Sequence, residues 1–366
     1  MKKVFIITLC WVLIQAFFYV QNYLFVTDLV HLEKLSGSYE FWPDFIGNFL
    51  LSIVGGLFGG YYLVYRMPFM FTKRSFTYGI VNSGLYFVVL FVGLAIICLF
   101  LLGFTYFIFQ TDFAAAFAKA TDNVLLNLNT PSFFTTMIMW GLLVSATQFM
   151  LQVNDKFGQG VLVKFLTGKY YKPREEERVF MFLDLKSSTS IAENIENRDF
   201  FELLREIYYD ITEPIISNLG EIYQYVGDEV VVTWSLEKGL QNNNCINCFF
   251  NIKKKLGGKN AHYKERYGIV PSFKAGLHVG KAIVGELGVI KKDIVYSGDV
   301  LNTTSRIQGL CNYHGVEILI SSALIQRLSF EGEFVNVPLG EIHLRGKKNT
   351  ISLNTLKIPD LTTKST

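Results

Sequence analysis

Two aspartates occupy positions from which carboxylate groups can bind metal ions. Asp184 ends the β-favouring run of residues 179–183, so we expect a buried strand that ends in a carboxylate. Asp228 follows Gly227 between two further β-favouring runs, so we expect it at the turn of a hairpin. If that hairpin pairs beside the first strand, both carboxylates reach one edge of a sheet and suit two divalent cations, Mg²⁺ or Mn²⁺. Taken alone, each aspartate is also typical of a turn or a helix cap.

Hydroxyl residues follow the first aspartate. Ser187, Ser188 and Thr189 precede an apolar-periodic stretch that extends to Ile211, a pattern that predicts the start of a helix. Free backbone N–H groups at such a start can hold an anion. The three residues are therefore candidates for contact with the phosphates of a substrate.

An amide and a guanidinium are spaced to share one face of a predicted helix. Residues 291–306 predict a strand, a tight turn and then a helix that carries Asn302 and Arg306. Their i, i+4 spacing puts both on one side. There an amide can orient a ribose, and a guanidinium can neutralise a phosphate or a charged transition state. A solvated polar face is the alternative interpretation.

The elements that must position these residues occupy only the second part of the chain. The sequence is 51% hydrophobic and 18% charged, and most of the charge follows Lys156. The first part is too apolar for a soluble domain of that size. The net charge of +3 and the isoelectric point of about 8.4 argue against a nucleic-acid partner.

Four apolar stretches in the first part are long enough to cross a bilayer, which takes about 20 residues. They are residues 4–25, 45–65, 79–109 and 132–151, and none contains Lys, Arg, Asp or Glu. A cleavable signal peptide is the alternative for the first stretch, but the run is long and aromatic-rich and lacks a small-x-small cleavage site. We therefore expect four transmembrane helices. Their lack of ionisable groups argues against a pump or ion channel.

Basic residues gather on alternate sides of these stretches. They are Lys2 and Lys3 before the first, Arg66, Lys73 and Arg74 between the second and third, and Lys156, Lys164 and Lys169 after the fourth. The other two loops carry only Lys34 and Lys119. The positive-inside rule then predicts a multi-pass protein of the cell (inner) membrane, with the N-terminus and the C-terminal domain in the cytoplasm.

The expected domains are residues 1–151 in the membrane, a connector at 152–178, a soluble domain at 179–358 and a tail at 359–366. The connector contains a spacing of apolar residues that suits a short amphipathic helix, which could pair with a second chain or lie on the bilayer. The five cysteines form no disulfide framework. We interpret Cys245 and Cys248 as two small apolar residues of a helix rather than half of a metal site.

Together these elements have the order and approximate spacing of the class III adenylate and guanylate cyclase catalytic domain, which residues 177–356 resemble. The shared markers are the Phe-Leu-Asp-Leu strand end at Asp184, the Val-Gly-Asp-Glu hairpin at Asp228, Gly-Leu-His-Val-Gly at 276–280, Gly-Asp at 298–299 ahead of Asn302 and Arg306, and Arg-Gly-Lys at 345–347. The resemblance implies a domain that works as a head-to-tail homodimer. The expected fold is a multi-pass α-helical membrane domain of four helices, followed by an α+β ferredoxin-like βαββαβ domain.

The resemblance also implies roles for individual residues. Asp184 and Asp228 correspond to metal ligands, Asn302 to a ribose-orienting residue and Arg306 to a transition-state residue donated by the opposite protomer. Lys347 matches a phosphate-contacting lysine in a looser part of the pattern. The implied reaction is in-line attack of the ribose 3′-hydroxyl of ATP on the α-phosphorus, which yields 3′,5′-cyclic AMP and pyrophosphate for signal transduction.

The base-contacting positions depart from the family pattern. Adenylate cyclases typically have a Lys where this chain has Gln224, and an Asp or Thr where it has Val295. Gln224 can donate and accept hydrogen bonds, whereas Val295 offers only shape. Asp293 could substitute if the strand register shifts. ATP is favoured by the frequency of adenylate cyclases, while GTP or a pyrimidine nucleotide stays open.

Two other functions compete with this interpretation. The hairpin at Asp228 resembles the Gly-Gly-Asp-Glu-Phe hairpin of diguanylate cyclases, but that family does not require Asn302 and Arg306 on a helix face. A catalytically inactive nucleotide-binding receptor is the other alternative. Inactive copies usually lose a metal carboxylate or the arginine, and this chain retains both.

Overall fold

A computed structural model describes residues 1–31, 41–67, 76–158, 160–330, 334–347 and 349–358 of the protein. The chain divides into two compact units, residues Met1–Phe157 and Gly158–Thr366. Lys34, Lys73 and Arg74, which contributed to the predicted topology, lie outside the described residues, as does the predicted tail at 359–366.

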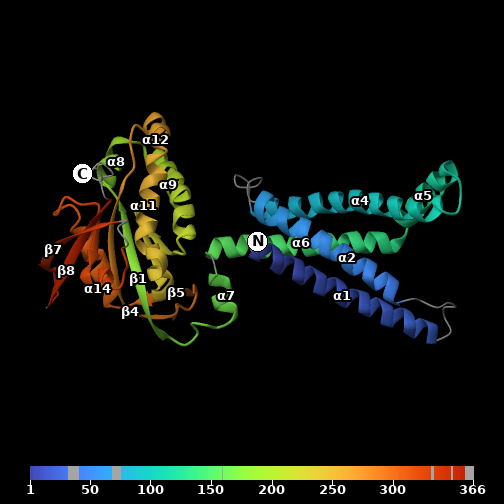
Figure 1. Ribbon diagram of the computed structural model, residues 1–366, viewed down its shortest axis with the longest axis horizontal. Coiled ribbons are helices and arrows are strands. Elements are labelled where there is room, and N and C mark those ends of the chain that lie inside the picture. The colour runs from blue at the N-terminus through green and yellow to red at the C-terminus, as the bar shows by residue number, and fades with distance from the viewer. Residues whose placement is uncertain (32–40, 68–75, 159, 331–333, 348, 359–366) are drawn as a thin grey trace, which may run out of the picture. The chain divides into compact units, whose positions relative to one another are not determined.

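The first unit is helical (Figure 1). Its elements are α1 (Lys2–His31), α2 (Phe41–Tyr61), the π-helix η1 (Tyr62–Arg66), α4 (Phe76–Ile108), α5 (Phe113–Leu128) and α6 (Pro131–Phe157). Within the described residues, 3 helical segments are long and apolar enough to cross a membrane, namely Lys3–Asp28, Thr77–Ile108 and Phe133–Asn154. They coincide with the first, third and fourth predicted spans. The second, residues 45–65, is helical across α2 and η1 but is not among the three, so a fourth span stays a prediction.

Helix α5 occupies a segment, residues 111–130, that the sequence analysis treated only as a loop. Its buried residues Ala116, Ala120 and Val124 recur every four positions, which gives the helix one apolar stripe. The ring of Phe117 meets that of Phe100 on α4 at 5.2 Å between centroids. The loop is therefore largely a helix that packs on α4.

Large apolar side chains cover much of the surface of the first unit. Phe5, Phe17, Val89 and Leu142 are each more than 60% exposed. The buried cluster is small and centres on Trp11, whose indole N–H donates to the hydroxyl of Thr147 at 3.0 Å. Continuous apolar exposure of this kind is what helices facing lipid present.

The second unit is built on a sheet that carries helices on both faces. The helices at residues 197–217 and 244–257 cover one face, and the helix at residues 299–309 packs on the other. The elements of this unit are α7 (Val161–Leu166), β1 (Arg174–Leu185), α8 (Ser188–Asn194), α9 (Asn197–Ser217), β2 (Glu221–Val226), β3 (Glu229–Ser235), α10 (Leu236–Leu240), η2 (Gln241–Asn243), α11 (Asn244–Gly257), α12 (Asn260–Tyr267), β4 (Phe273–Leu287), β5 (Asp293–Ser297), α13 (Asp299–Gly309), β6 (Ile318–Ser321), α14 (Ser322–Ile325), β7 (Val335–His343) and β8 (Thr350–Lys357).

The sheet has the order β2-β3-β1-β4-β6-β8-β7, and β5 pairs with β4. The pairs are antiparallel except β4 with β6, which is parallel. The first four strands and the helices between them follow the predicted βαββαβ order, with β1 between β3 and β4. Strands β5 to β8 extend this core.

Strand β1 sends alternate side chains to two different cores. Val179, Met181 and Leu183 belong to the larger core, which α9 and α11 cover. Phe180 and Phe182 point to the opposite side, into a smaller cluster with aromatic side chains from the connector and β5. The continuous apolar run thus reflects burial on both faces of a strand near the middle of the sheet.

Two cysteines lie in the larger core, as interpreted from the sequence. Cys245 and Cys248 are fully buried on α11, and all five cysteines of the protein are free thiols. Burial raises the pKa of Cys245 to about 12. They therefore act as small apolar side chains.

Two local expectations differ from the structure, and a third is confirmed. The predicted strand begins at 179, but β1 begins at Arg174, so the charged run at 175–178 belongs to the strand rather than to a connector. Pairing with β4 supplies hydrogen bonds that outweigh the poor strand propensity of Glu. The expected helix after Ser187 is broken, because Ile195 and Glu196 adopt extended backbone between α8 and α9. Helix α7 confirms the short helix expected in the connector.

Candidate active site

The structure brings the two predicted aspartates together. In the antiparallel pairing of β1 with β3, Asp184 lies opposite Glu229, and Asp228 is the turn residue that directly precedes Glu229. Burial and the nearby carboxylate of Asp228 raise the pKa of Asp184, while Lys274 opposes the rise. We call this group of Asp184, Asp228, Glu229 and their cross-strand neighbours the carboxylate edge.

Two neighbours of Asp184 were missed in the sequence analysis. Lys274 is its cross-strand partner on β4, and Lys274 Nζ lies 3.2 Å from Asp184 Oδ2. Gln308 of α13 donates from Nε2 to the same oxygen at 3.1 Å. The helix can approach because β4 carries Gly276 there, where a Cβ would lie 2.4 Å from the backbone nitrogen of Gln308. Only the strand register and this close packing could have revealed the two residues.

The donor set at the carboxylate edge fits divalent cations. Burial, Asp184 and Asp228 together raise the pKa of Glu229 to about 7, so negative charge is in excess there. Among the residues that the structure describes, no group of three or more His, Cys, Asp or Glu side chains is arranged to hold an ion. Magnesium needs no such cage, because it is usually bound by one or two carboxylates together with water and substrate phosphates. Asp184 and Asp228 meet that requirement.

Tyr208 of α9 anchors the turn that carries Asp228. Its hydroxyl donates to the backbone carbonyl of Gly227 at 2.6 Å, and its ring lies 4.6 Å from that of Tyr225. Gly227 has φ of +61°, a left-handed conformation that glycine adopts without strain. Burial and the charge of Asp228 raise the pKa of Tyr208 to about 12, so it remains a neutral donor.

The exposed face of α13 carries the predicted amide and guanidinium. The buried side of the helix consists of Val300, Thr303, Thr304, Ile307 and Gln308. Asn302 is exposed and Arg306 partly exposed. The guanidinium of Arg306 makes no hydrogen bond or ion pair with any residue in the described part of the chain, and it lies beside Gly346. We call Asn302, Arg306 and the adjacent Lys347 the arginine face.

Lys347 is already engaged within the chain. Its ammonium pairs with Asp299 at the start of α13 and holds the pKa of that carboxyl below its usual range. Gln308, which contacts Asp184, lies two residues beyond Arg306 and therefore about 200° around the helix. Arg306 thus lies on the side of α13 opposite the contact with its own carboxylate edge.

The positions expected to contact the base lie on β2 and β5. Gln224 is exposed and Val295 partly buried. Their neighbours Tyr223 and Tyr296 touch edge to face, with 4.9 Å between ring centroids, so the structure brings the two strands together. Asp293, the possible substitute, is exposed and pairs with Lys291 at 3.0 Å.

The hydroxyl residues after Asp184 form the turn into α8. Ser187 has a left-handed backbone with φ of 60°, which is uncommon outside glycine. Ser188 and Thr189 begin the helix, and Thr189 is exposed. These residues follow Asp184 by three to five positions in the sequence. Their contact with phosphate stays a prediction.

Comparison with known proteins agrees with this geometry. Residues 170–355, slightly more than half of the chain, match the adenylate and guanylate cyclase catalytic domain. The chain belongs to this family. The match covers the carboxylate edge, the arginine face and both positions expected to contact the base.

Relatives of the cyclase domain include enzymes named for either purine. The chain is 37% identical to "Adenylate cyclase 2" of Rhizobium meliloti (strain 1021) over 57% of its own length and 57% of that protein. It is 26% identical to "Retinal guanylyl cyclase 2" of Rattus norvegicus over 45% of its length and 15% of that protein. The match therefore spans little more than half of the length of the Rhizobium meliloti protein and a smaller share of the Rattus norvegicus protein.

A solved structure shares the fold. A bacterial light-regulated adenylyl cyclase superposes with a TM-score of 0.53 at 19% identity, covering 63% of this chain and 67% of that one. At that identity the likeness supports the architecture alone.

Proposed function

We propose that the protein is a membrane-bound adenylate cyclase that converts ATP to 3′,5′-cyclic AMP and pyrophosphate as a head-to-tail homodimer. The observation that carries the proposal is the register of β1 with β3, which sets Asp184 beside Asp228 while α13 presents Arg306 away from them. Identity of 37% to an adenylate cyclase supports the same activity.

In this proposal Asp184 and Asp228 hold two divalent cations, Mg²⁺ or Mn²⁺. When bound, the cations supply charge that holds the triphosphate and favours ionisation of the ribose 3′-hydroxyl. Lys274 and Gln308 orient Asp184 through its Oδ2, which leaves its other oxygen for a ligand. Tyr208 fixes the turn and thereby the direction of Asp228.

The arginine face of a second protomer completes the site. Arg306 stabilises charge that develops on the α-phosphate and the bridging oxygen, and Asn302 orients the ribose so that the 3′-oxygen attacks in line. Lys347 reaches phosphate only by leaving Asp299, so its contribution depends on that exchange. Ser187, Ser188 and Thr189 offer hydroxyl and backbone donors near the phosphates.

ATP is the proposed substrate, with GTP or a pyrimidine nucleotide as the alternative. Relatives named for both purines occur, and Gln224 and Val295 depart from the Lys and the Asp or Thr that adenylate cyclases typically have. A purely nucleotide-binding receptor is disfavoured, because the chain retains both candidate metal carboxylates and the candidate transition-state arginine.

We further propose that the first unit anchors the enzyme in the cell membrane through four spans, with the cyclase domain in the cytoplasm. The apolar exposure of α1, α4 and α6 supports such an anchor. The basic residues on alternate loops support the orientation.

One experiment tests the proposed activity. Full-length protein in lipid nanodiscs is incubated with Mg²⁺ or Mn²⁺ and equal concentrations of ATP, GTP, CTP and UTP, and the cyclic products are separated by mass. We expect cyclic AMP to predominate and to disappear when the cations are chelated. Predominance of another cyclic nucleotide would assign a different substrate, and nucleotide binding without product would favour the receptor.

A further inference from the structure

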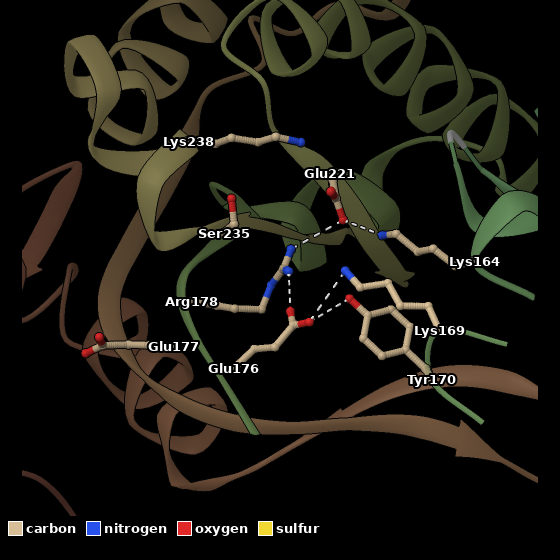
Figure 2. Close-up of a pocket in the computed structure, with 9 residues that line it drawn as sticks. All are labelled: Lys164, Lys169, Tyr170, Glu176, Glu177, Arg178, Glu221, Ser235 and Lys238. Carbon is tan, nitrogen blue, oxygen red and sulfur yellow. Dashed lines mark hydrogen bonds and ion pairs between the residues drawn. The ribbon is translucent and has the colours of Figure 1, made fainter. Parts of the chain in front are cut away.

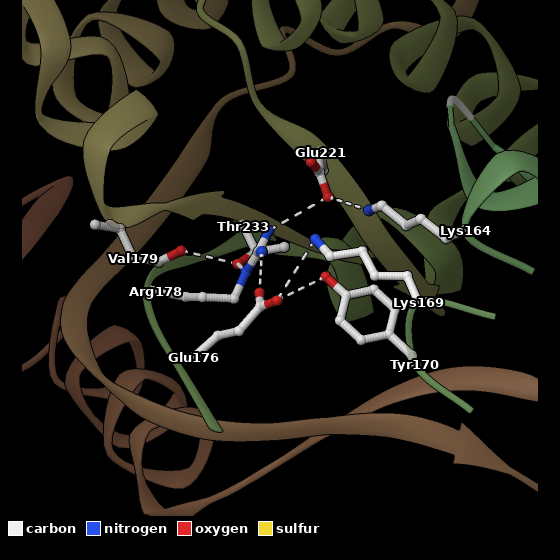
Figure 3. Close-up of polar contacts among 8 residues, drawn as sticks. All are labelled: Lys164, Lys169, Tyr170, Glu176, Arg178, Val179, Glu221 and Thr233. Atoms are coloured by element: carbon white, nitrogen blue, oxygen red, sulfur yellow. Dashed lines mark hydrogen bonds and ion pairs between the residues drawn. The ribbon is translucent and has the colours of Figure 1, made fainter. Parts of the chain in front are cut away.

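Arg178 is a buried charge that the proposed chemistry does not use. Only 3% of its side chain is exposed. Its guanidinium donates to Glu176 at 2.9 Å, to Glu221 at 3.3 Å and to Thr233 at 3.1 Å (Figure 3). The ring of Tyr296 lies 4.9 Å from the guanidinium carbon. A guanidinium whose nitrogens are all engaged in a planar fork holds its partners in fixed places, so Arg178 ties together β1, β2, β3 and β5.

The connector shares the carboxylates that Arg178 binds. Lys164 of α7 lies 2.9 Å from the oxygen of Glu221 that also faces Arg178. The hydroxyl of Tyr170 donates to Glu176 at 2.9 Å. Figure 2 shows Lys164 and Tyr170 reaching the two carboxylates from the connector. Although burial acts in the other direction, Lys164 and Arg178 hold the pKa of Glu221 below its usual value, so this cluster stays ionised.

The same cluster reaches the strands that carry the base positions. Glu221 begins β2 three residues before Gln224, and Tyr296 directly follows Val295 on β5. The pairing of β2 with β3 shifts register just before Gln224, which leaves Tyr223 as the extra residue of a bulge. Bulges redirect neighbouring side chains. The hydroxyl of Tyr223 accepts from the backbone N–H of Tyr296 at 3.4 Å. This hydrogen bond, rather than pairing between the two strands, joins the part of β2 that carries Gln224 to the part of β5 that carries Val295.

We propose that Arg178 is a positioning residue for recognition of the nucleotide base, and that Lys164 and Tyr170 of the connector tune it. The inference rests on the proposed function, in which Gln224 and Val295 face the base. When the connector moves and Lys164 leaves Glu221, that carboxylate is held by Arg178 alone, and the start of β2 shifts relative to β5. Small displacements of positioned groups are enough to change binding of a substrate.

The test compares two nucleotides rather than overall activity. Full-length protein in nanodiscs carries Lys164→Met or Tyr170→Phe, and steady-state kinetics are measured with ATP and GTP. We expect the ratio of kcat/KM for ATP to that for GTP to change by about three- to tenfold, mainly through KM, because base contacts are altered while the reacting groups are not. The matched control is Lys253→Met, which breaks an exposed ion pair with Glu317 and should leave the ratio unchanged.

Arg178 itself is tested by a conservative pair. Arg178→Lys keeps a charge and should retain more of the nucleotide preference than Arg178→Met. If the Met variant does not fold, the two connector variants still decide the question. A uniform loss of kcat with an unchanged ATP to GTP ratio would assign Arg178 a purely structural role and overturn the proposal.

Failure of the proposed function is distinguishable from failure of this inference. If the unmodified protein forms no cyclic product, the ratio of dissociation constants for fluorescent ATP and GTP analogues replaces the kinetic ratio. A shift of that ratio in Lys164→Met would support the positioning role even then. An unchanged ratio, or no nucleotide binding at all, would refute it.

Discussion

The carboxylate edge and the arginine face differ in how far one chain completes their chemistry. At the carboxylate edge, Asp184 already pairs with Lys274 and accepts from Gln308, and burial together with the neighbouring carboxylates raises the pKa of Glu229 to about 7. On the arginine face, the guanidinium of Arg306 makes no hydrogen bond or ion pair within the part of the chain that the structure covers. The carboxylate edge thus has more negative than positive charge, whereas the arginine face presents the guanidinium of Arg306 without a partner among the described residues. Complementary halves on one chain favour a site assembled from two copies.

Removing a carboxylate should have the largest effect. Asp184→Asn keeps the shape of the side chain but loses its charge, so we expect cyclase activity to fall by at least about 10³-fold, equivalent to several kcal/mol of lost electrostatic stabilisation. Product formation is measured on full-length protein at saturating cation. Asp199→Asn, at the start of α9, is the matched control and should remain active. Comparable activity in the two variants would break the assignment of the carboxylate edge.

Removing the guanidinium should cost somewhat less. Arg306→Ala should lower activity by about 10²- to 10³-fold, because charge in the transition state loses one fixed donor. Arg205→Ala, which breaks an exposed pair with Glu202, serves as the control.

Mixing the two inactive variants sharpens the comparison of the two regions. Co-expressed Asp184→Asn and Arg306→Ala chains form mixed dimers with one intact site, so activity should recover to about a quarter of the unmodified level. No recovery, with mixed dimers demonstrated by two affinity tags, would argue that each chain works alone.

A smaller effect is expected at the support of the carboxylate edge. Tyr208→Phe deletes the hydrogen bond to Gly227 but keeps the ring against Tyr225. The turn that carries Asp228 should loosen, and activity should fall by up to about tenfold, the equivalent of one hydrogen bond. Tyr313→Phe, on an 84% exposed side chain, is the control for loss of a hydroxyl. Equal activities would show that the turn needs no anchor.

The smallest effect concerns pH and a residue near the arginine face. Burial, with Lys347 nearby, lowers the pKa of His278 from 6.5 to about 4, and its Nδ1 lies 2.8 Å from the hydroxyl of Ser321. Between these values the unfolded chain binds a proton that the folded chain does not. As far as His278 is concerned, the free energy of unfolding is therefore highest above pH 6.5 and decreases as the pH falls toward 4.

Thermal unfolding of the full-length protein at pH 7.5, 6.5 and 5.5 measures this loss. The Tm should decrease by a few degrees as the pH is lowered from 7.5 to 5.5. The variant His278→Gln, which retains a polar partner for Ser321, should show a smaller decrease. Parallel curves for the two proteins would assign the pH dependence to other groups.

Sequence patterns located the residues of the carboxylate edge and the arginine face but not the residues that hold them. The β-favouring run before Asp184, the Gly-Asp turn at Asp228 and the helix that carries Arg306 all occur where expected. Lys274 and Gln308 escaped notice, because each contacts Asp184 only through strand register or helix packing. The roles of these residues in catalysis stay predictions until the variants are measured.

The first strand shows why some boundaries failed. Its charged start, residues 175–178, has poor strand propensity, and only pairing with β4 makes it a strand. The same segment holds Arg178, whose burial could not be inferred from a run of charges, since such runs are usually solvated.

The sequence by itself determined the division into an apolar helical part and a mixed α and β part, the main strands and helices of the cyclase domain, and the residue types of the site. It could do so because hydropathy, periodicity and turn chemistry act between residues close in the chain. Only the tertiary structure decided that Asp184 meets Lys274, that Arg178 joins the connector to β2 and β5, and that α13 turns Arg306 outward. Those outcomes depend on register and packing between segments far apart in sequence, which no local pattern encodes.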